Sequence, residues 1–136
     1  MHVTPYLTFN GNCEEALRAY EKILSGKITA KMTYGESPMA TQTPGEWRNK
    51  IMHARFAFGD NSLMASDAPP NRFQKMQGMH VTLSLKDPAE AERIYEALAE
   101  GGTVGVPLAE TFWAVKFGML NDRFGTPWMI NCEKPA

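Results

Sequence analysis

Two segments of the chain place an apolar residue at every second position, as a strand with one face on the core does. Residues 3–9 alternate in this way with Tyr6 and Thr8 on the polar face, and residues 79–85 repeat the pattern with His80 on the polar face. The alternation predicts one strand in each segment. The polar face of each strand is left for contacts other than packing against a helix.

Each segment is followed by a stretch with helical periodicity. Apolar residues recur three and four positions apart between positions 16 and 24 and between positions 91 and 98, which predicts two helices with one apolar stripe each. Residues that favour the start and the end of a helix flank both stripes: Asn12 and Asp87 with Pro88 before them, Gly26 and Gly101 with Gly102 after them. Each apolar stripe must pack against the face of a sheet to be buried.

The two halves of the chain repeat each other. Five residues recur with identical spacing seventy-five positions later: Glu15, Ala16, Arg18, Tyr20 and Glu21 as Glu90, Ala91, Arg93, Tyr95 and Glu96. Such self-similarity indicates a duplicated unit. Three strand-like runs follow each helix, at about 27–35, 50–58 and 62–66 and at about 103–109, 112–120 and 127–132. The sequence therefore predicts an α+β fold of two tandem βαβββ modules, about 1–68 and about 78–136, in one domain of 136 residues.

The first half is the longer one because of residues 36–50. This stretch holds Pro38, Pro44 and Gly45 among Thr and Gln residues, a composition typical of loops. Long loops in compact domains are often functional, so we expect a lid over a binding site.

Composition restricts the partners. The chain carries 14 Lys and Arg against 15 Asp and Glu, and the basic residues are scattered. This argues against nucleic acid and against a polybasic membrane patch. The chain lacks an apolar run that could span a bilayer and lacks the features of a signal peptide. We therefore expect a cytoplasmic protein whose partner is a small molecule or another protein chain, with no nucleic acid and no membrane.

Local phrases of the sequence resemble the PhnB-like branch of the vicinal oxygen chelate superfamily, which includes glyoxalase I, bleomycin-resistance proteins, fosfomycin-resistance enzymes and extradiol dioxygenases. The phrases are Pro5, Tyr6, Leu7 and Phe9; Leu63 to Asp67; Phe112 with Trp113; Phe117 with Gly118; and Asp122 to Gly125 with Trp128 and Asn131. The resemblance implies mixed sheets that curve around a cleft with the helices outside, and a homodimer. In enzymatic members, His, Gln or Glu residues of the strands hold a divalent metal in the cleft.

This chain departs from that ligand pattern at three of its four positions. His80 fits, but its counterpart in the first half is Thr4 or Pro5, and Met129 and Leu63 stand where a carboxylate is expected. We therefore expect no metal cofactor. If a divalent metal binds, it does so through His80 with replacement ligands drawn from His53, Asp67 and Glu110.

Polar residues of the predicted strands are candidates for ligand binding. Tyr6, Thr8, His53, Arg55 and His80 could hold an anionic or polar small molecule by charge-assisted hydrogen bonds. The alternative is that the histidines and Arg55 satisfy one another and nearby carboxylates.

A second group of candidates is aromatic or acidic. Trp113 and Phe117, together with Met64, Met129 and Trp128, could line an apolar pocket, although core packing explains them as well. Asp67 ends a predicted strand and is either a ligand-binding carboxylate or a turn residue. Cys13 lies near a helix start, where its thiol could be activated, but a packing role is preferred because no general base is evident. Both Cys13 and Cys132 are expected to be reduced, since neither has a partner at metal-ligand spacing.

Three functions remain open at this point. One is a metal-free protein that binds or sequesters a small molecule in the cleft between the modules. The second is a lyase, isomerase or dioxygenase that uses a divalent metal on His80. The third is a purely structural or partner-binding dimer whose own side chains fill the cleft. Branch members sometimes carry the name of a ubiquinone-related methyltransferase, but the chain lacks the length and the Gly-rich turn of a usual methyl-donor domain. No catalytic residue can be assigned.

Overall fold

The first of two units, Met1–Lys75, is built from one helix and four strands in the computed structural model, which describes residues 1–135. Its elements are β1 (Tyr6–Phe9), α1 (Cys13–Leu24), β2 (Lys27–Thr33), β3 (Ile51–Phe58) and β4 (Asn61–Asp67). The strand order across the sheet is β1-β4-β3-β2. The pair β1 and β4 is parallel, and the other pairs are antiparallel, so the sheet is mixed.

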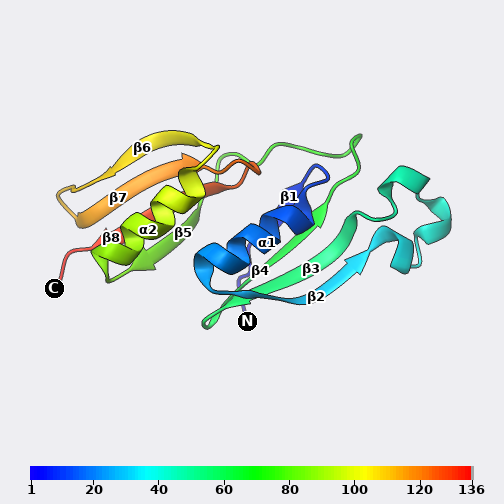
Figure 1. Ribbon diagram of the computed structural model, residues 1–136, viewed down its shortest axis with the longest axis horizontal. Coiled ribbons are helices and arrows are strands. Elements are labelled where there is room, and N and C mark those ends of the chain that lie inside the picture. Colours follow the sequence, from blue (N-terminus) through cyan, green and yellow to red (C-terminus); the bar gives the residue numbers. More distant parts are fainter. Residues whose placement is uncertain (136) are drawn as a thin grey trace. The chain divides into compact units, whose positions relative to one another are not determined.

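The second unit, Met76–Ala136, repeats this arrangement (Figure 1). Its elements are β5 (Val81–Leu85), α2 (Pro88–Ala99), β6 (Thr103–Ala109), β7 (Ala114–Asn121) and β8 (Pro127–Glu133), and the strand order is β5-β8-β7-β6. Again the first and last strands are parallel partners. The predicted α+β fold with a duplicated βαβββ order is confirmed. His80, however, lies just before β5 rather than inside it.

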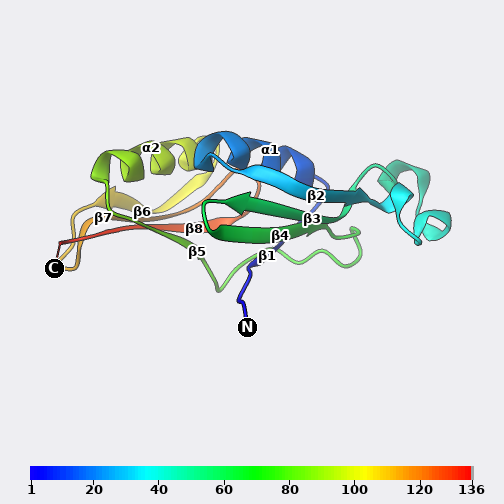
Figure 2. The same ribbon diagram turned by 90° about the horizontal axis from the view of Figure 1, so that it is seen from below.

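In unit 1 the apolar stripe of α1 is buried against one face of the sheet (Figure 2). Leu17 and Tyr20 on the helix and Phe56 and Leu63 on the sheet are almost completely buried. The rings of Tyr20 and Phe56 meet edge to face, with centroids 6.4 Å apart. Because side chains alternate along a strand, this leaves every second residue of the sheet on the face away from α1.

In unit 2 the stripe of α2 is buried on its own sheet in the same way. Tyr95 packs over Gly118, where a Cβ atom would lie 2.6 Å from the Tyr95 ring. The Tyr95 hydroxyl donates a hydrogen bond of 2.9 Å to the carbonyl of Val106. Glycine at position 118 is therefore needed for the helix to approach β6 and β7.

The predicted helix end at Gly26 has a different physical basis from the one expected. The left-handed residue after α1 is Ser25, with φ 54° and ψ 46°, and not Gly26. At Gly26 an added Cβ atom would lie 2.5 Å from Phe56 Cζ and 2.7 Å from the carbonyl oxygen of Ala57. Gly26 thus allows the chain to pass close to β3. Gly101, in contrast, has φ +75° directly beyond α2.

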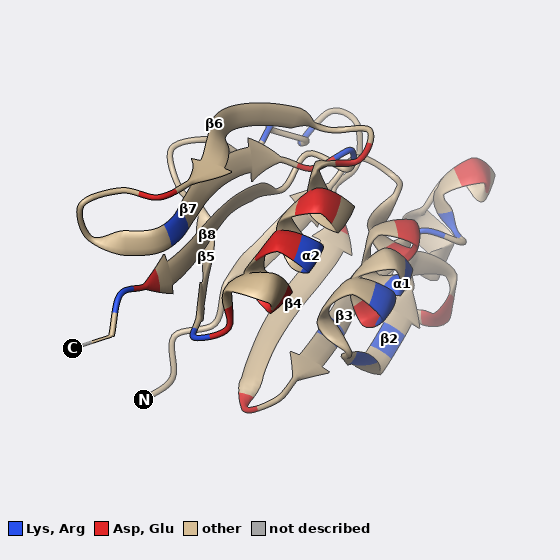
Figure 3. Cartoon of the chain, turned by 60° about the vertical axis from the view of Figure 1, so that its left-hand side comes forward, with Lys and Arg blue, Asp and Glu red and all other residues tan. Residues whose placement is uncertain are grey.

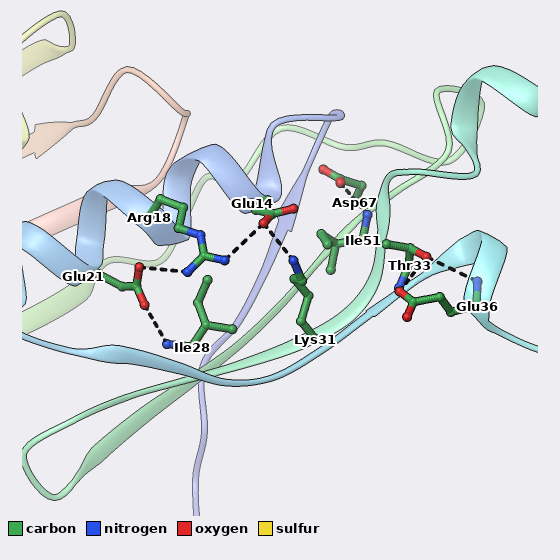
Figure 4. A network of polar contacts seen from close by, with 9 residues as sticks. All are labelled: Glu14, Arg18, Glu21, Ile28, Lys31, Thr33, Glu36, Ile51 and Asp67. Carbon is green, nitrogen blue, oxygen red and sulfur yellow. Dashed lines mark hydrogen bonds and ion pairs between the residues drawn. The ribbon is translucent and has the colours of Figure 1, made fainter.

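Polar contacts join α1 to the edge strand β2 (Figure 4). Lys31 Nζ lies 2.9 Å from Glu14 Oε2, and the Ile28 amide donates to Glu21 Oε2 at 3.1 Å. Arg18 pairs with both carboxylates. Basic and acidic residues recur along both helices (Figure 3). Exposed pairs of this kind contribute little stability, and they serve here to hold the edge strand in register.

The long loop predicted at 36–50 contains two short 3₁₀ turns, Ala40–Gln42 and Gly45–Trp47, and a third, Tyr34–Glu36, leads into it. Its base is closed by hydrogen bonds from the Tyr34 amide to the Lys50 carbonyl, 2.9 Å, and from the Gly35 amide to the Arg48 carbonyl, 2.8 Å. Thr33 and Glu36 cap the Tyr34–Glu36 turn reciprocally (Figure 4). The loop is therefore anchored at both ends within unit 1.

None of the helices in residues 1–135 combines the length and the apolar character that crossing a membrane requires.

Replacing Gly26 with alanine tests the close approach to β3. We expect Gly26→Ala to lower the free energy of unfolding by about 1–3 kcal/mol, because the methyl group would overlap backbone as well as a ring. Gly45→Ala is the matched control, since nothing lies within 4 Å of its Cβ position. Urea unfolding of both variants measures the difference, and equal stabilities would contradict the packing described here.

Candidate functional site

Four of the predicted ligand residues lie on the face of the unit 1 sheet that α1 does not cover. Tyr6 on β1 and Arg55 on β3 are both register partners of Met64 on β4. His53 lies two residues before Arg55, and Thr8 two residues after Tyr6, so both share this face. We call this surface the helix-free face of unit 1.

Two side-chain contacts connect residues on this face. The hydroxyl of Tyr6 lies 3.3 Å from Nδ1 of His53, and the two rings have centroids 5.9 Å apart. Nη2 of Arg55 lies 3.5 Å from the sulfur of Met64. A phenol, an imidazole and a guanidinium are thus grouped around one thioether.

Asp67 lies elsewhere, in the core of unit 1, where its side chain is about 1% exposed. Its Oδ1 accepts hydrogen bonds of 2.9 Å from the amides of Gly11 and Cys13. Its Oδ2 accepts one of 2.9 Å from the amide of Ile51 (Figure 4). The hydroxyl of Tyr34 donates to the Asp67 carbonyl at 2.7 Å. Both carboxylate oxygens are already used, so Asp67 has a structural role and is not available to a ligand.

This carboxylate also replaces the expected cap of α1. Asn12 occupies the N-cap position, but its side chain makes no capping hydrogen bond. Asp67 accepts from the first helical amide instead, and its negative charge lies at the positive end of the helix dipole. The cap of α1 therefore comes from β4, whereas Asp87 caps α2 locally by accepting from the Ala89 amide at 3.0 Å.

Cys13 is buried beside this carboxylate. Burial raises the pKa of its thiol far above the ordinary value, and the charges of Asp67 and Glu14 raise it further. A neutral thiol is a poor nucleophile. The structure therefore supports the packing role over the activated thiol. Both cysteines are free and buried.

In unit 2 the helix-free face carries Met129, which is the register partner of Thr82 on β5 and of Met119 on β7. By the same register the counterpart of Met129 in unit 1 is Met64. Leu63, the expected counterpart, is buried beneath α1. Counting from the turn glycine fails because the β7–β8 connection is longer than the β3–β4 turn.

The register also identifies the counterpart of His80. Thr82 and Tyr6 occupy equivalent positions beside Met129 and Met64. His80 lies two residues before Thr82, and its counterpart is therefore Thr4, not Pro5. The four positions that hold metal in enzymatic superfamily members are thus an imidazole, a hydroxyl and two thioethers.

This donor set does not fit the hard or borderline divalent ions that such sites hold, because thioethers favour soft ions. The other proposed ligands are engaged: Glu110 pairs with Lys134 at 3.3 Å, and Asp67 binds backbone amides. Within residues 1–135, no group of three His, Cys, Asp or Glu side chains is placed to hold a metal ion.

Unit 2 contains a pocket of ≈ 210 Å³. It is lined by His80, Thr103, Gly105, Val106, Met119, Leu120 and Asn121. Of these, His80, Thr103 and Asn121 offer polar atoms, and Met119 and Val106 offer apolar surface. The lining carries no carboxylate and no Lys or Arg, so the pocket suits a small, mainly neutral molecule.

Sequence reasoning identified His80 and missed the rest of this lining. Met119 and Asn121 follow Phe117 by two and four residues on β7, and extending the alternation from Phe117 would have found them. The β6 residues carry no such signal, because the register of β6 shifts around Gly105.

Trp113 and Phe117 lie next to each other. Their rings meet at 67° with centroids 5.1 Å apart, and Phe112 adds a further ring 4.7 Å from Trp113. Trp128 belongs to the core instead: it is fully buried, and its indole nitrogen donates to Asp122 at 2.8 Å. Of the two alternatives for Trp128, the structure supports core packing.

Replacing Asp67 with asparagine tests its structural role. An amide has one acceptor oxygen, so the NH₂ group would face at least one of the three backbone donors. We expect the free energy of unfolding to fall by about 3 kcal/mol. Asp60→Asn, in the exposed β3–β4 turn, is the matched control and should change little in the same chemical denaturation experiment. A variant as stable as the parent would show that the carboxylate is dispensable.

Thiol reactivity tests the environment of Cys13. We expect neither cysteine to react with Ellman's reagent in the native protein at mildly alkaline pH, and both to react in concentrated guanidinium chloride. Because the folded-state pKa of Cys13 is raised, the stability tied to its neutral thiol is present at low pH and declines as the pH rises above the unfolded-state value. In a Cys132→Ala variant, rapid native labelling would contradict the buried neutral thiol.

Comparisons with known proteins identify relatives along the whole chain. The model of the family described as 3-demethylubiquinone-9 3-methyltransferase matches residues 1–131. Protein YjdN of Escherichia coli (strain K12) is 34% identical over 142 residues, which cover 98% of this chain and 97% of that protein.

Solved structures agree. Protein PA1353 from Pseudomonas aeruginosa is 47% identical with a TM-score of 0.90, and the match covers 99% of each chain. A putative 3-demethylubiquinone-9 3-methyltransferase, PhnB protein, from Bacillus cereus is 25% identical with a TM-score of 0.82, over 97% of this chain and 99% of that one.

A glyoxylase/bleomycin resistance protein/dioxygenase domain from Frankia sp. EAN1pec shares the fold at 14% identity, with a TM-score of 0.64 over 98% of each chain. The chain therefore belongs to the PhnB-like family described as 3-demethylubiquinone-9 3-methyltransferase, and it has the fold of the glyoxylase/bleomycin resistance protein/dioxygenase domain.

Proposed function

We propose that the protein binds or sequesters a small organic molecule on the helix-free faces of its two sheets, without a divalent metal. The observation that carries this proposal is the register of the sheets, which puts the thioethers of Met64 and Met129 on the helix-free faces, at the positions where the superfamily resemblance implies a carboxylate ligand. A thioether is apolar and polarisable, and it makes favourable contacts with organic and aromatic groups.

The neighbours of the two thioethers support binding rather than metal chemistry. Met64 is flanked by Tyr6 and Arg55, and Met129 by Thr82 and Met119. Each face therefore combines apolar surface with a few polar groups. That combination is the usual make-up of a small-molecule site.

The family description names a methyltransferase, but the sequence has no Gly-rich turn between a strand and a helix of the kind that a usual methyl-donor domain carries. Residues 10–12, between β1 and α1, and residues 86–87, between β5 and α2, contain a single glycine, Gly11. We therefore do not propose methyl transfer.

The second candidate is a metal-dependent lyase, isomerase or dioxygenase that uses His80 with non-standard ligands. The observation in its favour is that His80 lines the pocket of unit 2 beside Asn121. An amide oxygen and an imidazole can both coordinate a metal. We also carry forward a homodimer and a cytoplasmic location as expectations, the first from the superfamily and the second from the composition.

Metal analysis separates the two candidates. We expect protein purified without chelators to contain far less than one zinc, nickel, iron or manganese per chain, and divalent ions to leave its melting temperature unchanged, because the donor set is mostly soft. His80→Ala and the control His2→Ala should behave like the parent. Near-stoichiometric metal that is lost in His80→Ala but kept in His2→Ala would overturn the proposal in favour of the enzyme.

Native mass spectrometry of the same preparations tests the binding itself. We expect a population that carries an organic ligand, and loss of that population in a Met129→Lys variant. Glu96→Lys, on the exposed side of α2, introduces the same side chain away from the helix-free face and is the control. If no ligand is retained and a panel of monocyclic compounds gives no binding signal by NMR, the binding function fails.

A further inference from the structure

We propose that the helix-free face of unit 1 binds the carboxylate group of an organic anion through Arg55, His53 and Tyr6. This rests on the proposed binding function and specifies the charge of the ligand. The inference starts from the arrangement of three side chains that come from two strands separated by β4.

The three polar groups lie over neighbouring positions of the sheet. Arg55 and His53 project from the same face of β3, two residues apart. Tyr6 starts on β1, and its hydroxyl reaches across β4 to lie 3.3 Å from His53 Nδ1. Met64, between β1 and β3, contacts Arg55 from the other side of this group. A ligand atom above Met64 would therefore be near all three groups.

Arg55 lacks a charged partner within the described residues, unlike Arg18 and Lys31 of the same unit. Arg18 and Lys31 pair with Glu14, and Lys50 donates to the carbonyl of Gly11. Arg55 forms no ion pair within the described residues 1–135, and its contact is the sulfur of Met64. A thioether is a weak acceptor and carries no charge. The guanidinium thus keeps its positive charge and most of its donors for a ligand.

The surrounding side chains do not supply a counter-charge from the same face. The positions that share it in the adjacent rows of β1, β4 and β2 carry no carboxylate: they are Thr8, Ser62, Ser66, Ala30 and Met32, with Lys27 as a further cation. Asp67, the carboxylate closest in sequence on β4, is turned into the core and bound by backbone amides. None of these positions therefore balances the positive charge of Arg55.

The Tyr6–His53 pair adds a donor whichever tautomer is present. If the phenol donates to Nδ1 of a neutral imidazole, the proton of His53 lies on Nε2 and is free to donate. If Nδ1 carries the proton and donates to the phenol oxygen, the Tyr6 hydroxyl keeps its own hydrogen for a ligand. Together with Arg55 the face presents donors and a positive charge. The planar guanidinium matches a carboxylate in a bidentate pair.

Apolar surface next to these donors indicates an organic ligand rather than a free inorganic anion. Tyr6 is 46% exposed, and Met32, the register partner of His53, is 40% exposed. The ring of Tyr6 and the thioethers of Met32 and Met64 offer contact to an aromatic or aliphatic body. The class of ligand is therefore a small aromatic or aliphatic carboxylate.

Benzoate and its neutral analogue benzamide test the charge requirement on the full chain, by NMR titration or calorimetry. We expect benzoate to bind at least ten times more tightly than benzamide, and inorganic phosphate at equal concentration not to displace it. Arg55→Gln should weaken benzoate at least tenfold and leave benzamide unchanged. Arg93→Gln, which removes the same charge from the outer side of α2, is the matched control and should bind benzoate like the parent.

Each other outcome is decisive. Equal affinity for benzoate and benzamide, unchanged benzoate binding by Arg55→Gln, or no measurable binding of benzoate overturns the carboxylate site. Displacement by phosphate would show a general anion site and overturns the organic class. In each of these cases the carboxylate proposal fails, whereas the proposed binding function still stands if native mass spectrometry shows a retained organic ligand. If Arg55→Gln proves unstable, Arg55→Lys, which keeps the charge but not the bidentate fork, should still weaken benzoate several-fold.

Discussion

The carboxylate of Asp67 joins more of unit 1 than any single pair of packed side chains does. It accepts backbone hydrogen bonds from the turn after β1, from the first residue of α1 and from the first residue of β3. The carbonyl of the same residue holds Tyr34 at the base of the long loop. A buried charge of this kind is tolerated because backbone amides satisfy both oxygens. This carboxylate also binds the first residue of β3, the strand that carries His53 and Arg55 on its polar face.

In unit 2 a different buried carboxylate accepts hydrogen bonds from backbone amides. Asp122, in the connection between β7 and β8, accepts hydrogen bonds from the amides of Phe124 and Thr126 and from the indole of Trp128. Each unit thus has one buried carboxylate that binds backbone amides, but the two lie at different places: Asp67 ends β4, and Asp122 follows β7. The length of the β7–β8 connection differs accordingly from that of the β3–β4 turn. This is why equivalent strand positions have to be taken from the hydrogen-bonded register and not from the turn glycines.

The sequence predicts the local features of this fold well, because strand alternation and helical stripes are encoded within a few residues. The two helices and eight strands lie close to their expected positions, and the alternation places Tyr6, His53 and Arg55 on one face. What it cannot predict is contacts between distant residues. Asp67 caps a helix 54 positions earlier in the chain, and nothing near Asn12 signals that. The counterpart of Met129 is likewise Met64 and not Leu63 because of the pairing between strands, which the local sequence does not reveal.

A binding site built on Arg55 would act on a ligand differently from a site built on a divalent metal ion. A bound divalent ion and a guanidinium both attract ligand oxygens, but they differ in what they do next. The ion polarises a bound oxygen and can activate water, whereas a guanidinium with a pKa above the physiological range only orients and neutralises a negative group. Arg55, beside Met64, can attract a ligand oxygen in the second way, and the thioethers of Met64 and Met129 add no group that would activate it. Retention of an organic anion is therefore the function that we propose for these faces.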